Sequence, residues 1–459
     1  MEITKNINKD IFREYDIRGV YPTDLTENVS YTIGRGFASY IRDLGKNVCV
    51  VGHDNRLSSP LLYDSLIKGL TDSGVDVISL GLCTTPMYYY ACIYKKIYQG
   101  LMVTASHNPK EYNGYKIAFS EEGNAKGKEI TDFYDYLMKG DFKEGHGLVT
   151  EYNVHDDYID LFDKSLSFGS RTPRVLIDPG NGTTSIIVHD LFDRYLDGVQ
   201  YIFDESDGTF PNHHPDPAVE ENLSILKKKV VEGNFDCGIS FDGDGDRVGL
   251  VSNSGKYIPA DLIMLIVIRN IINKVSKKEF LYDVKCTKAL SDEIEKLGGK
   301  GVMYRTGNSY TKAAVRDMDL PYGGELSGHM YFRDKFPGFD SGIYAGLRIC
   351  EILSHTDKSI DELLEGINKY YSTPEIKIAT TDDAKFKIVE KVREYADSRN
   401  YKYVTMDGVK IMFDDSWALV RASNTGPNLT LRFEARSEER LEELKSEFLG
   451  VVNINLDIK

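Results

Sequence analysis

The sequence of 459 residues is long enough for about three domains. Hydrophobic residues make up 41% of it and charged residues 28%, which are the proportions of a folded globular protein and exclude a disordered, collagen-like or coiled-coil chain. The formal net charge of −15 argues against a nonspecific nucleic-acid binder and against polybasic attachment to a membrane. Local Arg and Lys side chains would have to bind any anionic ligand against this net charge.

Signals for membrane insertion, secretion and disulfides are missing from the sequence. The longest apolar run, 262–268, is far shorter than the roughly 20 residues of a membrane helix. The polar N-terminus lacks the apolar core of a signal peptide, so we expect a cytoplasmic protein without membrane or nucleic-acid partners. The cysteines lack CxxC spacing, which favours buried thiols of a reducing compartment. They are Cys49, Cys83, Cys92, Cys237, Cys286 and Cys350.

Short apolar runs alternate with helical patterns over the first 370 or so residues, as in an α/β protein with mixed sheets and crossover helices. The first block predicts a strand at 47–54, a helix at 59–74, a strand at 75–81, a helix at 85–96 and a strand within 99–109. The pattern then restarts twice. The second block predicts strands within 174–182, 199–204 and 237–247, with a helix up to about 196 and a Lys-rich helix between them. The third predicts a helix at 260–275 and strands within 279–286, 300–309 and 320–329.

The last 90 or so residues show a different pattern. It predicts strands at 375–380, 402–405, 409–413, 417–422 and 429–434, a helix at 382–399 and a C-terminal helix from about 437. This order is typical of a small α+β domain with an antiparallel sheet. We therefore expect three related α/β domains and a smaller α+β domain, packed closely because no Ser- or Pro-rich linker separates them. The expected boundaries are 1–153, 154–256, 257–370 and 371–459.

The first loop with candidate chemistry is TASHNP, 104–109, at the end of a predicted strand. Ligands of open α/β sheets bind at the carboxyl ends of strands. Ser106, beside His107, is therefore placed to act as a nucleophile or a phosphoryl carrier, although a plain turn explains the loop equally well. Lys116 follows ten residues later and is close enough in sequence to fold back onto the loop.

The second loop is DGDGDR, in which Asp242, Asp244 and Asp246 alternate with glycines after an apolar strand. Three carboxylates this close repel one another unless a cation lies among them, and oxygen ligands suit a hard ion such as Mg²⁺. An EF-hand is rejected because its Gly and Glu positions hold Arg247 and Asn253. Arg247 would offer a donor to an anion that bridges to the metal. An acidic surface turn is the alternative.

The third loop is GGELSGHM, 323–330. Glu325 would accept hydrogen bonds from two adjacent sugar hydroxyls, Ser327 would supply a third contact and His329 would move protons near neutral pH. A Gly-rich hairpin explains this loop nearly as well.

The fourth loop lies in RASNTGPNLTLRFEA, 421–435. Donors that would hold a phosphate or another dianion are concentrated there. They are Arg421, Ser423, Asn424 and Thr425. A plain hairpin needs only the turn residues, so the Arg-x-Ser sequence is what separates the two interpretations.

Together the motifs resemble the α-D-phosphohexomutase superfamily, and within it the phosphomannomutase/phosphoglucomutase branch. Any one motif could occur by chance, whereas eight of them in the order of the family are highly specific. In chain order they are YDIRG (15–19), TASHNP, NGYK, DGDGDR, VKC (284–286), RTGNS (305–309), GELSGH and RASNTGP. The resemblance implies three α/β domains and a smaller C-terminal domain around one central cleft.

The resemblance also implies a role for each site residue. Ser106 would carry a phosphoryl group, and Lys116 would serve as a positive charge or general acid/base. The other residues near the reacting phosphate would be Tyr15, Arg18, His107 and Arg247. Mg²⁺ would be bound by Asp242, Asp244, Asp246 and an oxygen of phosphorylated Ser106. The sugar would be contacted by Lys285, Asn308, Glu325, Ser327 and His329, and the non-reacting phosphate by Arg421, Ser423, Asn424 and Thr425.

The implied activity is the interconversion of hexose 1-phosphate and hexose 6-phosphate, of mannose, glucose or both, with a hexose 1,6-bisphosphate as intermediate and activator. Asn308 departs from the family, which commonly has His in a TGHS motif; Asn can still bind a hydroxyl but cannot change charge. A phosphoglucosamine mutase and a non-catalytic sugar-phosphate-binding paralogue are the alternatives. A phosphatase of the haloacid-dehalogenase type is disfavoured because no DxDx(T/V) motif ends an early strand.

Overall fold

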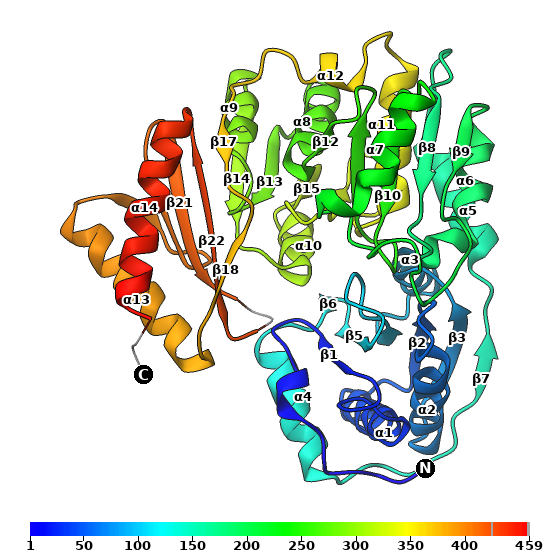
Figure 1. The fold of residues 1–459 in the computed structure, drawn as a ribbon. Coiled ribbons are helices and arrows are strands. Elements are labelled where there is room, and N and C mark those ends of the chain that lie inside the picture. The colour runs from blue at the N-terminus through cyan, green and yellow to red at the C-terminus, as the bar shows by residue number, and fades with distance from the viewer. Residues whose placement is uncertain (424–425, 457–459) are drawn as a thin grey trace.

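The computed structural model describes residues 1–423 and 426–456, which form four successive units, each with its own sheet (Figure 1). Three units combine α-helices with mixed sheets, and the fourth is a smaller α+β unit. This architecture confirms the predicted fold class. No helix in the described part of the chain is both long enough and apolar enough to cross a membrane.

The first unit contains a seven-stranded sheet in the order β1-β5-β4-β2-β3-β7, with β6 paired to β5. Its strands are β1 (Ile17–Val20), β2 (Val48–His53), β3 (Asp76–Leu82), β4 (Gly100–Val103), β5 (Tyr112–Ser120), β6 (Gly123–Asn124) and β7 (Val149–Glu151). Its helices are α1 (Glu27–Asp43), α2 (Ser59–Asp72), α3 (Thr85–Lys95) and α4 (Lys128–Lys139), and α5 (His155–Ser165) leads to the second unit. The sheet is mixed because β4 is parallel to β2 and antiparallel to β5.

The second unit has the strand order β12-β11-β10-β8-β9. Its elements are β8 (Val175–Asp178), α6 (Val188–Tyr195), β9 (Val199–Tyr201), α7 (Ser224–Glu232), β10 (Cys237–Phe241), β11 (Val248–Ser252) and β12 (Tyr257–Ile258). The helix predicted up to about 196 is α6, and a short 3-10 helix, Thr183–Ile186, precedes it. The Thr183 N–H donates to the Gly243 carbonyl at 2.8 Å, which holds this short helix against the neighbouring loop, 242–247.

The third unit has the strand order β14-β13-β15-β16. Its strands are β13 (Glu279–Asp283), β14 (Lys300–Tyr304), β15 (Tyr322–Gly324) and β16 (Met330–Phe332). Its helices are α8 (Ala260–Ile271), α9 (Lys288–Lys296), α10 (Asn308–Asp317), α11 (Gly342–Ser354) and α12 (Ile360–Leu363). One hydrophobic core cluster runs through all of the first three units, from Tyr88 on α3 to Phe241 on β10 and Ile343 on α11. These units are therefore packed closely, as the lack of linkers predicts.

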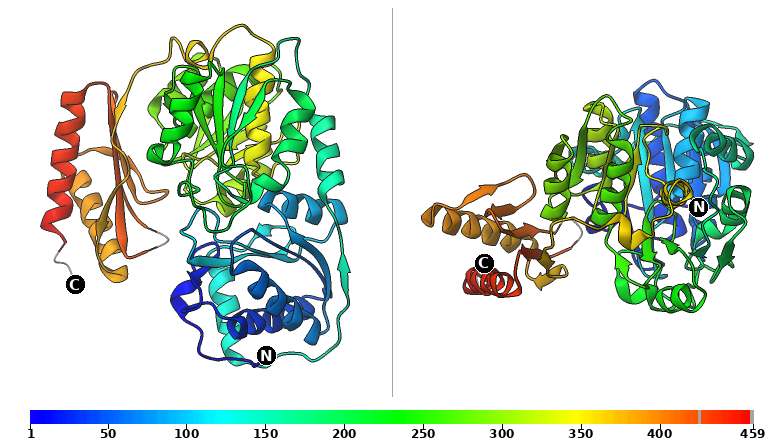
Figure 2. Two further views of the ribbon diagram at one scale, coloured as in Figure 1. Left: turned by 45° about the vertical axis from the view of Figure 1, so that its right-hand side comes forward. Right: turned by 90° about the horizontal axis from the view of Figure 1, so that it is seen from above.

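The fourth unit is an antiparallel sheet in the order β17-β22-β21-β20-β19, with β18 paired to β22. Its strands are β17 (Tyr371–Ser372), β18 (Ile376–Ala379), β19 (Lys402–Val404), β20 (Val409–Met412), β21 (Ser416–Ala422) and β22 (Asn428–Ala435). Two helices, α13 (Asp382–Ser398) and α14 (Glu438–Ile454), pack on one face around a separate core. Figure 1 and the right-hand view of Figure 2 show this unit beside the third one, with the second one farther away.

The two central strands that lead to the candidate site are completely buried. Every residue of β4 and of β10 is buried, and each strand lies between two neighbours in its sheet. The loop 104–109 follows β4 and the loop 242–247 follows β10. Burial on both faces explains their continuous apolar sequences, and it fixes the position of the polar loops that follow.

All six cysteines are free and buried, which confirms the prediction of buried thiols.

Candidate active site

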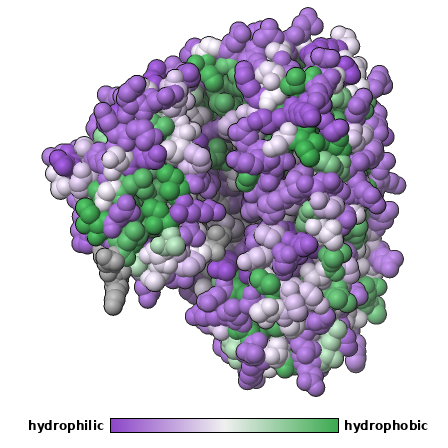
Figure 3. Space-filling view, in the orientation of Figure 1, coloured by the Kyte–Doolittle hydropathy of each residue, from purple (hydrophilic) through white to green (hydrophobic). Residues whose placement is uncertain are grey.

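A cleft of about 880 Å³ lies where the four units meet, and residues from all four line it. Figure 3 shows the C-terminal unit set apart from the body of the molecule by a hollow with mostly hydrophilic borders. The predicted residues that line the cleft are Tyr15, Arg18, Ser106, His107, Lys116, Arg247, Lys285, Asn308, Glu325, Ser327, His329, Arg421 and Ser423. The structure thus brings together side chains more than 400 residues apart in sequence, such as Tyr15 and Ser423. Asn424 and Thr425 lie outside the described residues.

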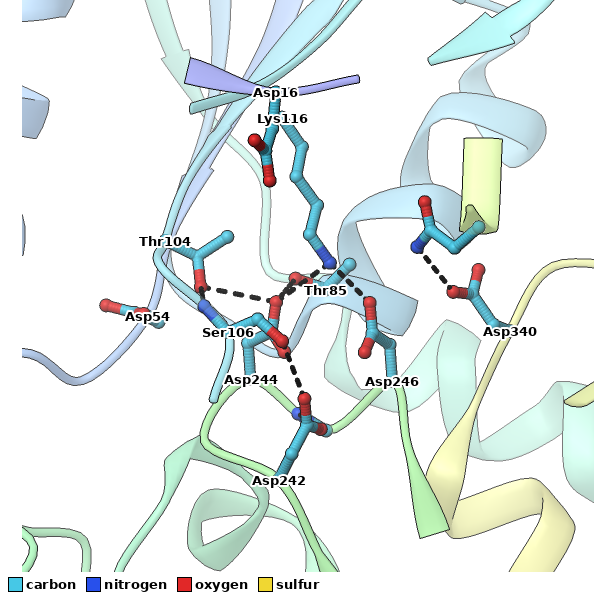
Figure 4. Close-up of polar contacts among 12 residues, drawn as sticks. Asp16, Asp54, Thr85, Thr104, Ser106, Lys116, Asp242, Asp244, Asp246 and Asp340 are labelled. Atoms are coloured by element: carbon cyan, nitrogen blue, oxygen red, sulfur yellow. Dashed lines mark hydrogen bonds and ion pairs between the residues drawn. The ribbon is translucent and has the colours of Figure 1, made fainter. Parts of the chain in front are cut away.

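Ser106 is held at the meeting point of two loops (Figure 4). Its backbone is in the left-handed region, with φ of 49°, which is uncommon for a residue other than glycine. The Ser106 N–H donates to Thr104 Oγ1 at 2.9 Å, and its hydroxyl donates to Asp242 Oδ2 at 2.7 Å. His107 Nδ1 lies 3.3 Å from the same hydroxyl. The left-handed backbone therefore turns the hydroxyl of the first unit toward the carboxylates of the second.

The imidazole of His107 is neutral in this environment. Burial and the guanidinium groups of Arg247 and Arg18 hold its pKa well below the ordinary value. A neutral ring can accept a proton or a hydrogen bond at one nitrogen, so His107 adds no fixed positive charge beside Ser106.

Three buried carboxylates form the acidic cluster of Asp242, Asp244 and Asp246. One oxygen from each lies within 4.8 Å of the others. Among the described residues, Asp244 Oδ1 and Asp246 Oδ1 have no hydrogen-bond partner although both are buried. Unpartnered buried oxygens are costly unless a cation compensates them, so this donor set fits a hard divalent ion.

Contacts from three units hold the main chain of the acidic loop. The Thr85 N–H donates to the Asp244 carbonyl at 2.9 Å, and the Gly342 N–H donates to the Gly245 carbonyl at 2.9 Å. With Thr183 on the Gly243 carbonyl, each of the first three units supplies one N–H. The Thr85 hydroxyl also donates to Asp244 Oδ2 at 2.6 Å. The first three units therefore all contact the acidic loop and meet at it.

Lys116 points from β5 into the acidic cluster (Figure 4). Its Nζ lies 3.0 Å from Asp244 Oδ2 and makes a second ion pair with Asp246. Burial alone would lower the pKa of Lys116, but the charges of Asp244 and Asp246 outweigh it and raise the pKa well above the ordinary value. Lys116 is thus an ammonium in this arrangement.

Neighbouring carboxylates in the cluster have opposite pKa shifts. Burial and the charges of Asp244 and Asp246 raise the pKa of Asp242 well above the ordinary value. Burial also acts against the charge on Asp244, but Lys116 and the Thr85 hydroxyl overcome it and hold the Asp244 pKa below the ordinary value. The positive charge of Lys116 is therefore concentrated on one side of the cluster.

Cationic side chains surround the Ser106 side of the cleft. Arg18 Nη1 donates to Asn108 Oδ1 at 2.7 Å, within the Ser106 loop. Arg247 Nε donates to His329 Nε2 at 2.9 Å and lies 3.8 Å from Asp242 Oδ2. Burial, together with Asp16, raises the pKa of Tyr15, so its phenol stays protonated. These groups can stabilise a phosphate at Ser106.

Glu325 and its neighbours form the wall contributed by the third unit. Glu325 Oε1 accepts from the Gly307 N–H at 2.7 Å and from the Thr311 hydroxyl at 2.8 Å. Burial raises the Glu325 pKa although His329 acts against the shift. Lys285 Nζ lies 2.9 Å from Glu375 Oε1, at the border with the fourth unit. Ser327 lines the same wall.

Asp340 is a buried carboxylate of this wall that sequence reasoning missed. Asn308 Nδ2 donates to Asp340 Oδ2 at 3.0 Å, and His329 Nδ1 lies 2.9 Å from the same oxygen. Burial disfavours its charge, but Lys312 and His329 reverse this effect and lower its pKa. Asn308 is thus held by a carboxylate that also orients His329. No family motif in the sequence covers Asp340 or Lys312.

The fourth unit contributes Arg421 and Ser423 to the cleft, at the end of β21. Arg421 Nε lies 3.1 Å from Asp407 Oδ2. Asp407 Oδ2 also accepts from the Thr306 N–H of the third unit at 3.1 Å. Lys377 and Arg432 line the same part of the cleft and were not predicted; both lie in strand patterns that gave no functional signal. The result is a cationic region at the far end from Ser106.

Three α/β units and a C-terminal α+β unit around a cleft with a serine, an acidic triplet and a cationic far end define the phosphohexomutase class of enzymes. Four segments match the family described as phosphoglucomutase/phosphomannomutase: its alpha/beta/alpha domain I at 9–144, domain II at 156–255, domain III at 259–370 and its C-terminal domain at 375–451. The chain belongs to the phosphoglucomutase/phosphomannomutase family.

Individual relatives agree with this assignment. The chain is 39% identical over 438 residues to the phosphomannomutase/phosphoglucomutase of Pseudomonas aeruginosa, covering 95% of this chain and 94% of that one. It is 36% identical over 454 residues to a phosphoglucomutase of Neisseria gonorrhoeae, with 98% of each chain covered. The crystal structure of a phosphoglucomutase/phosphomannomutase family protein from Burkholderia thailandensis matches with a TM-score of 0.91 and 34% identity, covering 98% of this chain and 99% of that one.

Proposed function

We propose that the protein is an isomerase that interconverts hexose 1-phosphates and hexose 6-phosphates through a phosphorylated Ser106. The observation that carries this proposal is the buried Ser106 hydroxyl, held 2.7 Å from an acidic triplet inside a cleft lined by cations from all four units. The phosphoryl group of phosphoserine would pass to the free hydroxyl of a hexose monophosphate, so that the P–Oγ bond breaks as a P–O bond to the sugar forms. The resulting hexose 1,6-bisphosphate would turn over in the cleft and return its other phosphoryl group to Ser106.

Charge stabilisation accounts for the residues around Ser106. Phosphoryl transfer spreads negative charge over the transferring group, and positioned cations stabilise that charge. Arg18 and Arg247 would bind its oxygens, and Lys116 would act as a positive charge or proton donor because it is an ammonium in this arrangement. His329 lies on the wall that the third unit contributes, here called the sugar wall, and its imidazole would take or return the hydroxyl proton. Asp340 lies on its Nδ1 side.

The acidic triplet would hold Mg²⁺, with an oxygen of phosphorylated Ser106 as a further ligand. The two unpartnered buried oxygens, Asp244 Oδ1 and Asp246 Oδ1, favour this assignment. When bound, the ion supplies positive charge that polarises the phosphoryl group. The protein's own contribution is to fix the three carboxylates by main-chain contacts from three units and to exclude water as the cleft closes.

Recognition of the substrate falls to the third and fourth units in this proposal. Glu325 would accept hydrogen bonds from two adjacent sugar hydroxyls in either orientation of the bisphosphate, with Lys285, Asn308 and Ser327 beside it. The phosphate that does not react would be bound by Arg421, Ser423, Asn424 and Thr425. The relatives carry phosphomannomutase and phosphoglucomutase names, so mannose and glucose phosphates are the substrates we propose.

The test is steady-state kinetics of the wild-type protein with glucose 1-phosphate and mannose 1-phosphate, side by side, with Mg²⁺ and a trace of the matching 1,6-bisphosphate. We expect turnover with at least one of the two sugars, and a large loss of turnover in chelator. Binding of hexose phosphates without any turnover would instead support a non-catalytic sugar-phosphate-binding protein. A preference for glucosamine 1-phosphate in the same assay would favour the phosphoglucosamine mutase alternative.

A further inference from the structure

Arg56 is a buried arginine outside the cleft lining whose guanidinium wraps the Ser106 loop from behind. It is 1% exposed. Its Nη2 donates to the carbonyls of Ser106 and Asn108, each at 2.7 Å. Its Nη1 donates to the carbonyls of Pro109 at 2.7 Å and Tyr112 at 3.0 Å. One side chain therefore binds three main-chain oxygens of the Ser106 loop and a fourth at the start of β5.

Asp54 completes the hydrogen bonds of this guanidinium. Arg56 Nε donates to Asp54 Oδ2 at 3.2 Å, so all five N–H donors of the group have acceptors. Asp54 is itself 1% exposed, and its Oδ1 accepts from the Ser59 hydroxyl and from the Arg56 N–H. The Phe210 ring of the second unit lies 5.3 Å from Arg56 Cζ. The arginine is thus fixed from three sides.

Asn55, between these two residues, is connected to the acidic loop 242–247 through Thr183. The Asn55 N–H donates to Thr183 Oγ1 at 3.1 Å, and its Nδ2 donates to the Asn181 carbonyl at 2.8 Å. Thr183 in turn holds the Gly243 carbonyl of the acidic loop. The tripeptide 54–56 therefore contacts the Ser106 loop directly and the acidic loop through one residue.

The two loops need such a fixed relationship. A Cβ atom on Gly243 would come within 2.6 Å of the Ser106 carbonyl, so the loops already approach as closely as glycine permits. Ser106 itself is in a left-handed conformation that persists only where its surroundings hold it. The Ser106 carbonyl that faces Gly243 is one of the four that Arg56 binds.

We infer that Arg56 is a positioning residue of the mutase reaction: its guanidinium holds the Ser106 loop in register with the acidic triplet, and Asp54 and Asn55 fix the guanidinium and connect it to the acidic loop. This inference rests on the proposed function, because it gives Ser106 the phosphoryl group. Arg56 contacts neither substrate nor reacting atoms and acts through the loop alone. Its effect should fall on the transfer step, since the sugar wall and the far cationic end lie in other units.

The test compares Arg56→Lys with Arg35→Lys. A lysine keeps the charge but has three donors on one nitrogen, too few for five acceptors. Arg35 is a matched control: it is a buried arginine on α1 of the same unit, bound to Ser73 Oγ and Glu144, away from the cleft. The measurements are kcat and KM for hexose phosphates, the melting temperature, and amide hydrogen exchange of the segment 105–112.

We expect Arg56→Lys to lower kcat by about 10- to 100-fold with KM within about threefold, because small displacements of a reacting group cost this much. Exchange at 105–112 should become faster at temperatures well below melting. Arg35→Lys should lower the melting temperature and leave kcat and exchange at 105–112 unchanged. If Arg56→Lys leaves both kcat and this exchange at the wild-type values, or lowers only stability as Arg35→Lys does, the inference is wrong.

Asp54→Asn provides a second variant if Arg56→Lys does not fold. It retains the guanidinium but removes the charge that fixes Nε, so a smaller change in the same direction is expected in kcat and in exchange. No change in either quantity would overturn the inference. A failure of the proposed function is distinguishable, because it would appear as absent turnover in the wild-type protein. Amide exchange at 105–112 tests whether Arg56 holds the Ser106 loop and does not depend on turnover.

Discussion

Ser106 is the single side chain on which the proposed chemistry depends most directly. Ser106→Ala removes the hydroxyl that would carry the phosphoryl group, so mutase turnover should vanish. The variant should keep its fold, because it loses one hydrogen bond to Asp242 and creates no cavity in the core; the cost is about 1 kcal/mol. Intact-mass measurement should find a wild-type fraction heavier by one phosphate and none in the variant. Turnover near the wild-type value in Ser106→Ala would contradict the phosphoserine proposal.

The unequal carboxylates of the triplet give opposite expectations for two similar substitutions. In chelator, Asp242→Asn should leave the melting temperature unchanged or higher, since it removes a charge that burial and its neighbours disfavour. Asp244→Asn should lower it, because that carboxylate is stabilised by Lys116 and Thr85. Both should weaken Mg²⁺ binding in calorimetric titration. Equal changes in melting temperature would show that Lys116 does not distinguish the two carboxylates.

The same shifts set how the stability of the metal-free protein depends on pH. Asp244 has a lowered pKa in the folded state, so it contributes stability above its unfolded pKa of about 3.9 that is lost as pH falls toward the folded value. Asp242 has a raised pKa, so its contribution is present below about pH 3.9 and is lost as pH rises through the folded value. Melting curves of Asp242→Asn and wild type in chelator should therefore differ most at neutral pH, with the variant equal or higher, and converge in acid.

At the scale of secondary structure, the N-terminus of α3 fixes the acidic loop of another unit. Thr84 caps this helix by accepting from the Met87 N–H, which leaves the hydroxyl of Thr85 free to donate to Asp244 at 2.6 Å. Thr85→Val keeps the shape but removes the donor, so Mg²⁺ affinity should fall about 10- to 100-fold, as for other residues that orient a metal ligand. Thr85→Ser is the matched control and should bind Mg²⁺ nearly as wild type does. Equal affinity in Thr85→Val and Thr85→Ser would mean that α3 plays no part in orienting Asp244.

Most strands of the fold and the motif residues of the cleft were predictable from local sequence, and the long-range contacts were not. Apolar strands such as β4 and β10 have continuous patterns because both of their faces are buried. Thr85, Asp340 and Arg56 have no such signal, since their importance comes from partners that are distant in sequence. Lys116 was expected to fold back onto the Ser106 loop; it reaches the site because β5 runs antiparallel to β4, and its ammonium pairs with the second unit.

The whole molecule divides into a body of three units with a continuous core and a C-terminal unit attached to the third. A small apolar cluster of Val284, Trp417 and Leu419 joins these two units. Polar contacts lie beside it: Lys410 Nζ donates to the Val284 carbonyl at 2.7 Å, and Arg432 Nη1 donates to the Lys285 carbonyl at 2.8 Å. A small interface between separate cores permits relative motion more readily than a large hydrophobic one does. Both contacts end on the VKC segment, 284–286, which carries the cleft residue Lys285. A change in the position of the C-terminal unit would therefore displace Lys285 and the wall that the third unit contributes to the cleft.

In the proposed reaction, Arg421 would connect this geometry to substrate binding. In the structure its Nε faces Asp407, which also accepts from Thr306 of the third unit. Arg421→Ala should raise KM for hexose phosphates by about 10- to 100-fold, because it would remove a charged hydrogen-bond donor to the phosphate that is proposed not to react. The fall in kcat should be smaller, because binding of the remote phosphate also helps to close the cleft and align the reacting end. The melting temperature should change little, since Asp407 keeps its contact with Thr306.

The control for this prediction is Arg436→Ala. Arg436 lies just beyond β22 in the same unit, its side chain is 48% exposed and its partner Asp292 is 3.6 Å away. The substitution therefore removes a comparable charge outside the cleft. Its KM should stay at the wild-type value, because a surface ion pair contributes little and screening by salt reduces its effect on a distant phosphate. Measuring KM, kcat and the melting temperature of both variants on matched preparations separates phosphate binding from loss of net charge. If Arg421→Ala and Arg436→Ala raise KM equally, or if Arg421→Ala lowers only the melting temperature, then Arg421 only stabilises the hairpin of the C-terminal unit. The phosphate must then be bound elsewhere in the cleft.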